Sequence, residues 1–312
     1  MSRIVIALGG NALGNTPTEQ QQMVKQAVPS LVQLIKDGHQ IIVSHGNGPQ
    51  VGMIDLAFDT ACRTNEKIPP MPLPECAAMS QGYIGYHLQK ELSEELHREG
   101  IKLHTASVIT QSVVDANDPA FSSPTKPIGS FYTKEQAEAL MAKDPDLKFV
   151  EDAGRGWRRV VPSPKPIDIV EKGAILSMAE KNIVVIACGG GGIPVVKEAD
   201  GSLKGVAAVI DKDFASARLA ELVGADVLFI LTAVDRVAVN FGKPDQKFLE
   251  SITASEARKL CAQGHFAPGS MLPKVEAAIE FAQFRPGNKA IIASLEKAAL
   301  AVRGESGTAI TV

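Results

Sequence analysis

Three apolar, strand-like runs in this chain end directly in turns rich in glycine. The runs at 4–8, 40–44 and 183–188 lead into Gly9-Gly10-Asn11, His45-Gly46-Asn47-Gly48 and Gly189-Gly190-Gly191-Gly192. Backbone N–H groups in such turns are not shielded by a Cβ, so an anion can approach them closely. The three junctions therefore predict a sheet whose carboxyl edge binds a phosphate group.

Strand and helix signals alternate along most of the chain. Besides the three runs above, strands are predicted at 102–110, 206–210, 225–232 and 289–293, and helices at 18–36, 50–63, 79–99, 167–181, 213–223 and 274–284, with a capped helix starting near 253. Alternation of this kind is typical of parallel strands joined by crossover helices. We expect an α/β fold with a mainly parallel sheet of about eight strands. Pro29 lies inside the first helix and should bend or split it.

The pattern changes between about Asp115 and Pro166. Prolines cluster there, the apolar periodicity weakens, and only 135–142 reads as a helix, with Thr133 and Gln136 spaced as a capping box. Aromatic and β-branched residues in this stretch could pack a small core of their own. We expect a protruding subdomain at 115–166, inserted in a single domain that spans 1–312. Its basic run, Arg155, Arg158 and Arg159, could form a rim for anions or a solvated face.

Composition excludes several classes of partner. The net charge is −3 with both signs interspersed, which offers no basic stripe for nucleic acid and no polybasic patch for a membrane. No apolar stretch reaches the roughly 18 residues that span a bilayer, and the amino terminus runs straight into a strand, so a cytoplasmic protein is expected. The four cysteines form no C-x-x-C pair and are predicted to be reduced. The six histidines show no metal-ligand spacing, and no metal ligand is predicted.

Three lysines stand at the boundaries of predicted elements. Lys126, Lys212 and Lys274 each lie beside proline or small residues, a position from which a charge can point into a cleft. The alternative is that each is an ordinary solvated lysine. Neither of the two common nucleotide motifs, G-x-x-x-x-G-K-[ST] and G-x-G-x-x-G, accompanies them, so P-loop and Rossmann folds lose their main support.

Together these segments resemble the carbamate kinases of the amino-acid kinase superfamily. The resemblance extends over the whole chain and rests on the order and spacing of many motifs: Ala7 to Leu13, His45 to Gly52, Met79 to Tyr86, Pro124 to Gly129, Arg158 to Pro164, Gly189 to Pro194, Val209 to Asp213 and Pro273 to Ala277. It implies a three-layer αβα sandwich, a homodimer, and reversible phosphoryl transfer from ATP with Mg²⁺ to carbamate, giving carbamoyl phosphate and ADP. Members of the family usually make ATP in arginine or purine-derived catabolism.

The resemblance also implies roles for particular residues. Lys212 and Lys274 would contact the ATP phosphates, Asp213 would orient them, and Lys126 would reach in from the inserted subdomain. The phosphoryl group and carbamate would be held by Gly9, Gly10, Asn11, Gly46, Asn47 and Gly48. The nucleotide site would include Ala233, Asp235 and Met271.

Several alternatives stay open at this point. Asp213 could serve only as a helix N-cap, Asp211 could hold Mg²⁺ or only close a turn, and His45 could donate to substrate or be structural. Tyr83 and Tyr86 resemble a helix contact at a dimer surface. Leu272 and Glu75 depart from the usual family pattern and bear on the choice of acceptor. The chain could then be a kinase of another small carboxylate, or a nucleotide-binding sensor without activity.

Overall fold

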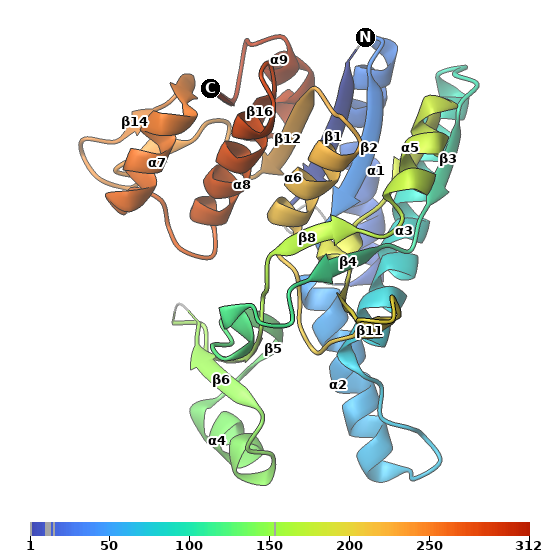
Figure 1. Cartoon of the computed structure of the whole chain (residues 1–312), viewed down its shortest axis with the longest axis vertical. Coiled ribbons are helices and arrows are strands. Elements are labelled where there is room, and N and C mark those ends of the chain that lie inside the picture. The colour runs from blue at the N-terminus through green and yellow to red at the C-terminus, as the bar shows by residue number, and fades with distance from the viewer. Residues whose placement is uncertain (1, 10–13, 15, 153) are drawn as a thin grey trace.

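The computed structural model describes residues 2–9, 14, 16–152 and 154–312 (Figure 1). Within these ranges the largest sheet has eight strands, in the order β15-β17-β16-β12-β1-β2-β9-β3, and all its pairs are parallel except β16 with β17. Its strands are β1 (Arg3–Leu8), β2 (Gln40–His45), β3 (His104–Ser107), β9 (Ile183–Ile186), β12 (Val227–Thr232), β15 (Ser251–Thr253), β16 (Lys289–Ser294) and β17 (Thr308–Thr311). The predicted sheet is confirmed.

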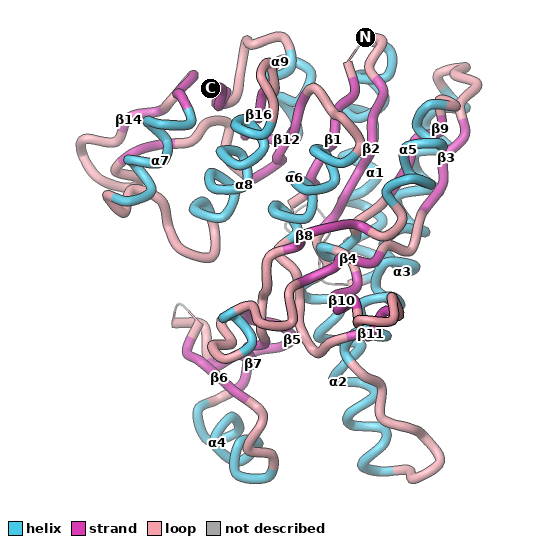
Figure 2. Tube along the Cα trace, viewed as in Figure 1, coloured by secondary structure: helices cyan, strands magenta, loops and turns pink. Residues whose placement is uncertain are grey.

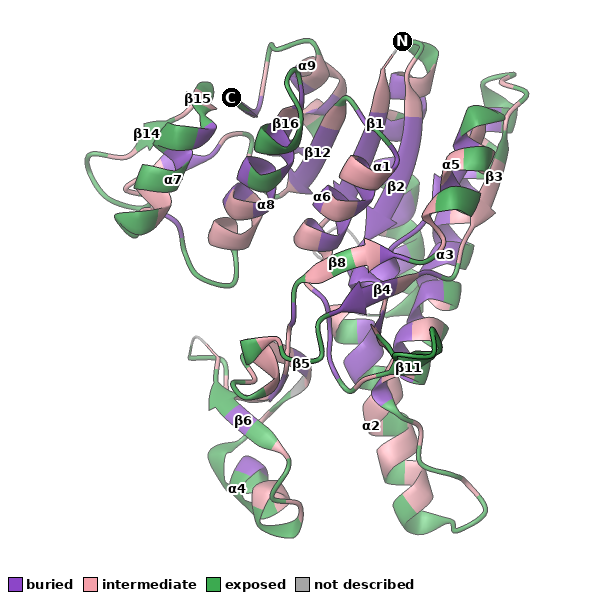
Figure 3. Ribbon diagram, viewed as in Figure 1, coloured by how far each residue is buried: buried purple, intermediate pink, exposed green. Residues whose placement is uncertain are grey.

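Helices cover both faces of this sheet. Alternate residues of β1 point in opposite directions, so Ile4 and Ile6 join one apolar cluster with α1 (Pro17–Lys36) and α3 (Leu73–Arg98), while Val5 and Ala7 join another. The second cluster contains residues of α5 (Lys172–Glu180), α6 (Lys212–Leu222), α7 (Ala254–Ala262) and α8 (Met271–Phe284). Figure 3 shows the central strands β1, β2, β12 and β16 as largely buried between these layers. A short α9 (Ala298–Val302) packs on the first face. The three-layer αβα arrangement is therefore confirmed.

Two smaller sheets lie beyond the carboxyl edge of the large one (Figure 2). One has the order β11-β10-β4-β8, formed by β4 (Gln111–Val114), β8 (Pro166–Ile169), β10 (Ile193–Lys197) and β11 (Leu203–Gly205). The other has the order β5-β7-β6 and carries α4: β5 (Lys126–Tyr132), α4 (Lys134–Lys143), β6 (Lys148–Glu151) and β7 (Trp157–Val161). Figure 1 shows α4 and β6 well away from the main sheet. A subdomain with the bounds 115–166 within a single domain 1–312 stays a prediction.

Helix α2 (Gly48–Thr64) begins at the predicted glycine turn. Short elements complete the described chain: η2 (Pro119–Phe121), η3 (Gly189–Gly191), η4 (Leu295–Lys297), β13 (Ala238–Val239) and β14 (Lys247–Phe248). Within the described ranges, no helix has both the length and the apolar character that crossing a membrane requires.

Most of the predicted helices are present, and the capping boxes at Thr133 with Gln136 and at Thr253 with Glu256 are confirmed. Pro29 does not split α1, which runs unbroken from Pro17 to Lys36. All four cysteines are free; Cys76 and Cys188 are buried, and burial raises the pKa of both thiols, that of Cys76 to about 11.

Three predicted elements were wrong in type or length. Residues 166–169 are strand β8 rather than the start of a helix, because Ile169 pairs with Ser112 of β4. The segment 206–210 is not a strand, although Val209 and Ile210 are buried. Its backbone makes isolated contacts instead, such as the bond from Val209 N to Pro162 O, so its apolar run reflects burial alone. The strand predicted at 102–110 is limited to β3.

Candidate active site

The first turn of α6 carries the charged centre of the site. Asp211 is the N-cap: its Oδ1 accepts the backbone N–H of Asp213 at 2.9 Å. The alternative in which Asp213 caps this helix is therefore wrong, and Asp213 lies in the first turn with its side chain free for other partners. Asp211 was expected to hold Mg²⁺ or close a turn; here it caps α6 and also binds a lysine.

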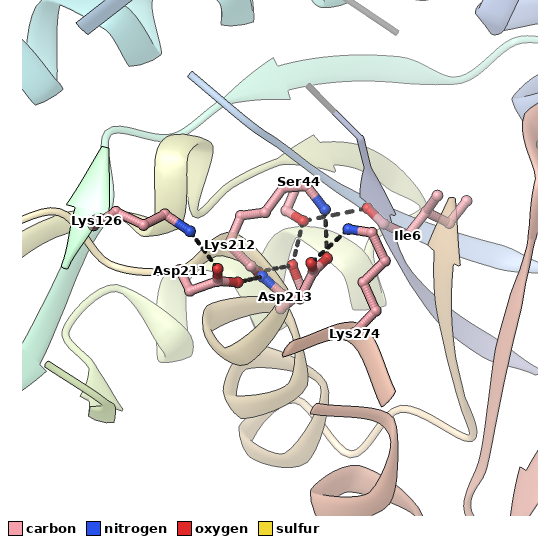
Figure 4. A network of polar contacts seen from close by, with 8 residues as sticks. Ile6, Ser44, Lys126, Asp211, Lys212, Asp213 and Lys274 are labelled. Atoms are coloured by element: carbon pink, nitrogen blue, oxygen red, sulfur yellow. Dashed lines mark hydrogen bonds and ion pairs between the residues drawn. The ribbon is translucent and has the colours of Figure 1, made fainter. Parts of the chain in front are cut away.

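Asp213 is shared by two lysines. Its Oδ2 accepts from Lys274 Nζ at 2.8 Å and its Oδ1 accepts from Lys212 Nζ (Figure 4). The three side chains are only 4, 11 and 15% exposed for Asp213, Lys212 and Lys274. Burial opposes ionisation of the carboxyl, but the two ammonium groups outweigh it and lower the pKa of Asp213 to about 2. Burial, together with the like charge of Lys274, lowers the pKa of Lys212.

Lys126 reaches the same place from the opposite side. It is the first residue of β5, and its Nζ lies 2.5 Å from Asp211 Oδ2. Figure 4 shows Lys126, Lys212 and Lys274 directed toward the two carboxylates at the start of α6. Three ammonium groups from distant parts of the chain thus meet around two carboxylates, which leaves a net positive charge.

Hydroxyl groups tie α6 to the sheet. Ser216 Oγ donates to the carbonyl of Lys212 at 2.6 Å and lies 2.6 Å from Ser44 Oγ at the end of β2. Ser44 Oγ in turn donates to Ser216 Oγ and lies 3.4 Å from Ile6 O of β1. Both serines are fully buried, so this chain of contacts fixes the helix start at the carboxyl edge of β1 and β2.

A cavity of about 210 Å³ lies at this edge. Seven of the predicted site residues line it: Gly46, Asn47, Gly48, Lys126, Lys212, Asp213 and Lys274. The helices α2 and α6 begin at its wall, as does α8, whose N-cap Ser270 also lines it. Helix N-termini carry a partial positive charge, so helix ends and ammonium groups together favour a multiply charged anion in this cavity.

The glycine run after β9 packs against the turn before α2. A Cβ added to Gly190 would lie 2.0 Å from Asn47 Nδ2, and one added to Gly189 would lie 2.4 Å from His45 Nε2. Asn47 itself is buried and donates from Nδ2 to Ser80 Oγ of α3 at 2.8 Å. The glycines are therefore required to let the two turns meet.

His45 is structural in this arrangement. Its Nδ1 lies 2.9 Å from the carbonyl oxygen of Gly46, and its side chain is buried. Burial lowers the pKa of His45 to about 4, and the charge of Lys212 acts in the same direction. The neutral imidazole supports the turn that lines the cavity.

Of the remaining predicted residues, those that the structure describes do not line this cavity. Gly9 follows β1 beside Leu231 O, and Gly10 and Asn11 lie outside the described residues. Asp235 binds Ser294 Oγ at 2.6 Å and Lys297 Nζ at 2.5 Å, on the wall of a separate cavity of about 350 Å³. Met271, the first residue of α8, packs against the core, and Ala233 is exposed after β12.

The basic run does not form an anion rim at the lysine cavity, and of its three arginines only Arg155 is well solvated, with a side chain that is 62% exposed. Arg159 turns toward α2 and lies 2.5 Å from Asp55 Oδ2. Arg155 and Arg158 pair with Asp152, and both stack over the ring of Phe131. None of the three lines the cavity of the lysines.

Comparison with known proteins places this site in a family. Residues 2–294 match the family model described as the amino acid kinase family. Because this match covers most of the chain, the protein belongs to the amino acid kinase family and is a phosphotransferase.

Its relatives narrow the assignment. The chain is 54% identical to a carbamate kinase of Clostridium perfringens, over 99% of both proteins, and 54% identical to the carbamate kinase-like protein YqeA of Escherichia coli, over 99% of this chain and 98% of that one. Among solved structures, carbamate kinase from Giardia lamblia bound to AMP-PNP has a TM-score of 0.91 at 44% identity, covering 99% of this chain and 98% of the other. Within the family, the chain groups with the carbamate kinases.

Proposed function

We propose that this protein transfers a phosphoryl group reversibly between ATP and carbamate, giving carbamoyl phosphate and ADP. The observation that carries the proposal is the meeting of Lys126, Lys212 and Lys274 at a cavity faced by helix N-termini. The carbamate kinases among its relatives, at about half identity over the full length, favour carbamate as the acceptor.

The chemistry requires positioning and charge more than a proton-transferring group. Carbamate is already an anion, so its oxygen can attack phosphorus without a general base. Negative charge spreads over the equatorial oxygens of the phosphoryl group during transfer, and buried ammonium groups stabilise it. We assign this role to Lys126, Lys212 and Lys274, and we assign to Asp213 the task of holding two of them in place.

The donor is a nucleotide with its magnesium ion. The kinase relatives include one described with AMP-PNP, which supports use of ATP and ADP. In the described part of the chain no group of three or more His, Cys, Asp or Glu side chains is placed to hold a metal, and Asp211 and Asp213 already bind lysines. We therefore treat Mg²⁺ as part of the MgATP or MgADP substrate. Gly9, Gly10 and Asn11 as phosphate-binding residues, and Ala233, Asp235 and Met271 as nucleotide-binding ones, remain part of the proposal.

Two statements about context belong to the same proposal. A cytoplasmic setting agrees with four cysteines that are all free. Flux toward ATP in arginine catabolism is proposed from the resemblance to the carbamate kinases alone. A homodimer agrees with the exposed apolar side chains on α3, where Tyr86 is 59% and Met79 37% exposed.

A coupled assay tests the acceptor. Purified protein is mixed with carbamoyl phosphate and MgADP, and ATP is measured. Rapid ATP formation is the expected result. ADP binding without ATP formation would instead indicate a sensor, and ATP formation only from another acyl phosphate would indicate a kinase of a different carboxylate. If ATP forms only from another acyl phosphate, Leu272→Gly is the first variant to make, because Leu272 is half-buried close to Lys274.

A further inference from the structure

Helix α2 links the phosphate turn to the strand that carries Lys126. Gly48 at its start lines the lysine cavity, and Gly52 and Asp55 lie four and seven residues further on, which places all three on one face of the helix. The same face that begins at the cavity therefore continues toward β5 and β7 of the small sheet.

Gly52 meets β5 backbone to backbone. A Cβ added to Gly52 would lie 2.1 Å from both N and Cα of Gly129, a distance that no real Cβ tolerates. Gly129 has a φ of 70°, in the left-handed region that favours glycine. Gly52 is thus needed for β5 to approach α2 this closely, and Gly129, three residues after Lys126, is needed for the left-handed backbone of β5 at that point.

One turn along α2, an ion pair fixes the neighbouring strand. Arg159 Nη1 donates to Asp55 Oδ2 at 2.5 Å, with side chains 30 and 17% exposed. In the β5–β7 pair, Arg159 lies opposite Ile128 and Val161 opposite Lys126. Beside it, Ile128 and Val161 are buried with Val51 of α2. Arg159 therefore holds the partner strand of Lys126, and does not itself reach the cavity.

We propose that Gly52, Asp55 and Arg159 are positioning residues that seat β5 on α2 and thereby set the place of the Lys126 ammonium group over the phosphate cavity. This inference rests on the role of Lys126 in the proposed function. The contacts act through the backbone of β5, so weakening them should lower turnover while leaving the nucleotide pocket unchanged.

Gly52→Ala is the sharpest variant, with Gly173→Ala as its control. Both glycines are helical with negative φ, but nothing lies within 4 Å of a Cβ on Gly173. We expect Gly52→Ala to remain folded and to lower kcat about 100-fold, as a shift of about 1 Å in a reacting group can do, with an unchanged KM for MgADP. Gly173→Ala should match wild type.

The same change is then made in a Lys126→Ala protein. If Gly52 acts through Lys126, the added alanine has little further effect there, less than about threefold. An equal loss of kcat in both backgrounds, or full activity of Gly52→Ala, would overturn the proposal. Arg159→Gln should lower kcat as Gly52→Ala does, and Arg159→Lys should retain most of the activity. If Arg159→Gln unfolds because it leaves the Asp55 carboxylate buried without a partner, the double variant Asp55→Asn with Arg159→Gln replaces it.

An activity-independent readout separates this inference from the proposed function. Amide hydrogen exchange across 126–132 should be faster in Gly52→Ala than in wild type and Gly173→Ala. If wild type forms no ATP, the proposed function fails, and hydrogen exchange alone still decides whether Gly52 holds β5 against α2. Unchanged exchange in Gly52→Ala would overturn it.

Discussion

Asp213 sets the charge of the whole site, because a single carboxylate compensates two buried ammonium groups. Lys212 and Lys274 lie 62 residues apart in sequence, yet both bind this side chain. Without it, two like charges would face each other in a poorly solvated place. The position of each lysine therefore depends on a residue that need not touch the substrate.

The lowered pKa of Asp213 predicts how stability depends on pH. The folded pKa of about 2 is below the ordinary value of 3.8, so the stabilisation is present above about pH 4 and is lost as pH falls toward 2. By pH 3 this carboxyl should account for roughly 1 kcal/mol of lost unfolding free energy. Urea unfolding at pH 5 and pH 3 measures this loss. Asp213→Asn should have a lower free energy of unfolding than wild type at pH 5, and that free energy should fall less between pH 5 and pH 3. Equal losses would contradict the assignment.

The lowered pKa of Lys212 predicts the pH at which kcat falls on the alkaline side of the pH profile. Burial lowers its pKa below the ordinary 10.5, and transfer requires the protonated form, so kcat should fall at a lower pH than an exposed lysine would give. Lys212→Arg keeps its charge throughout this range, so its limb should move to higher pH even if its kcat is reduced. A pH profile of kcat for the two proteins is the measurement, and coincident limbs would show that another group titrates.

His45 predicts that no limb appears near neutral pH. Its pKa of about 4 keeps the imidazole neutral from pH 5 upward, and kcat should therefore be flat through pH 6.5. Because unfolding restores the ordinary value of 6.5, stability should decline as pH falls from 6.5 to 4. His45→Gln should lose less stability over that interval in the same urea experiment; an identical decline would mean that His45 is not buried in neutral form.

At the scale of elements, the site is made where strands end and helices begin. The glycine run after β9 shows how strict this is, since Gly190 leaves no room for a Cβ beside Asn47. Gly201, in the turn between β10 and β11, has a similarly positive φ but open space around it.

This pair separates backbone strain from steric fit. Gly190→Ala should displace Asn47 and lower kcat by about 100-fold or destabilise the fold, whereas Gly201→Ala should cost only the strain of its φ, about 1 kcal/mol. Steady-state kinetics and thermal unfolding of both variants test this. Similar losses in the two would mean that φ, and not the contact with Asn47, decides.

Local signals predicted most of these elements and failed where pairing decides. Thr133 with Gln136 and Thr253 with Glu256 encode helix starts within four residues, and both were predicted. Residues 166–169 form a strand because they pair with β4, whereas 206–210 makes only isolated backbone bonds, such as Val206 N to Pro194 O, and joins no sheet. A single sequence holds no local record of such neighbours.

At the scale of the whole molecule, the fold brings Lys126 to α6 across 85 residues. The sequence indicated that each lysine stands at an element boundary, and the family resemblance indicated that they act together. That Asp211 both caps α6 and binds Lys126 was not predicted, since an N-cap aspartate is visible locally but its second partner is not. The same holds for the pair of Asp55 with Arg159, which joins two parts of the molecule 104 residues apart.

The most direct test of the account compares three lysine variants with one control in the ATP-forming assay. Lys126→Ala, Lys212→Ala and Lys274→Ala should each lower kcat about 100-fold or more, by analogy with loss of an oxyanion donor, and each should remain folded. Lys36→Ala, which removes an exposed lysine paired with Glu99, should match wild type. If folded Lys212→Ala or Lys274→Ala protein turns over at a near-normal rate, the convergence of ammonium groups is not what transfers the phosphoryl group.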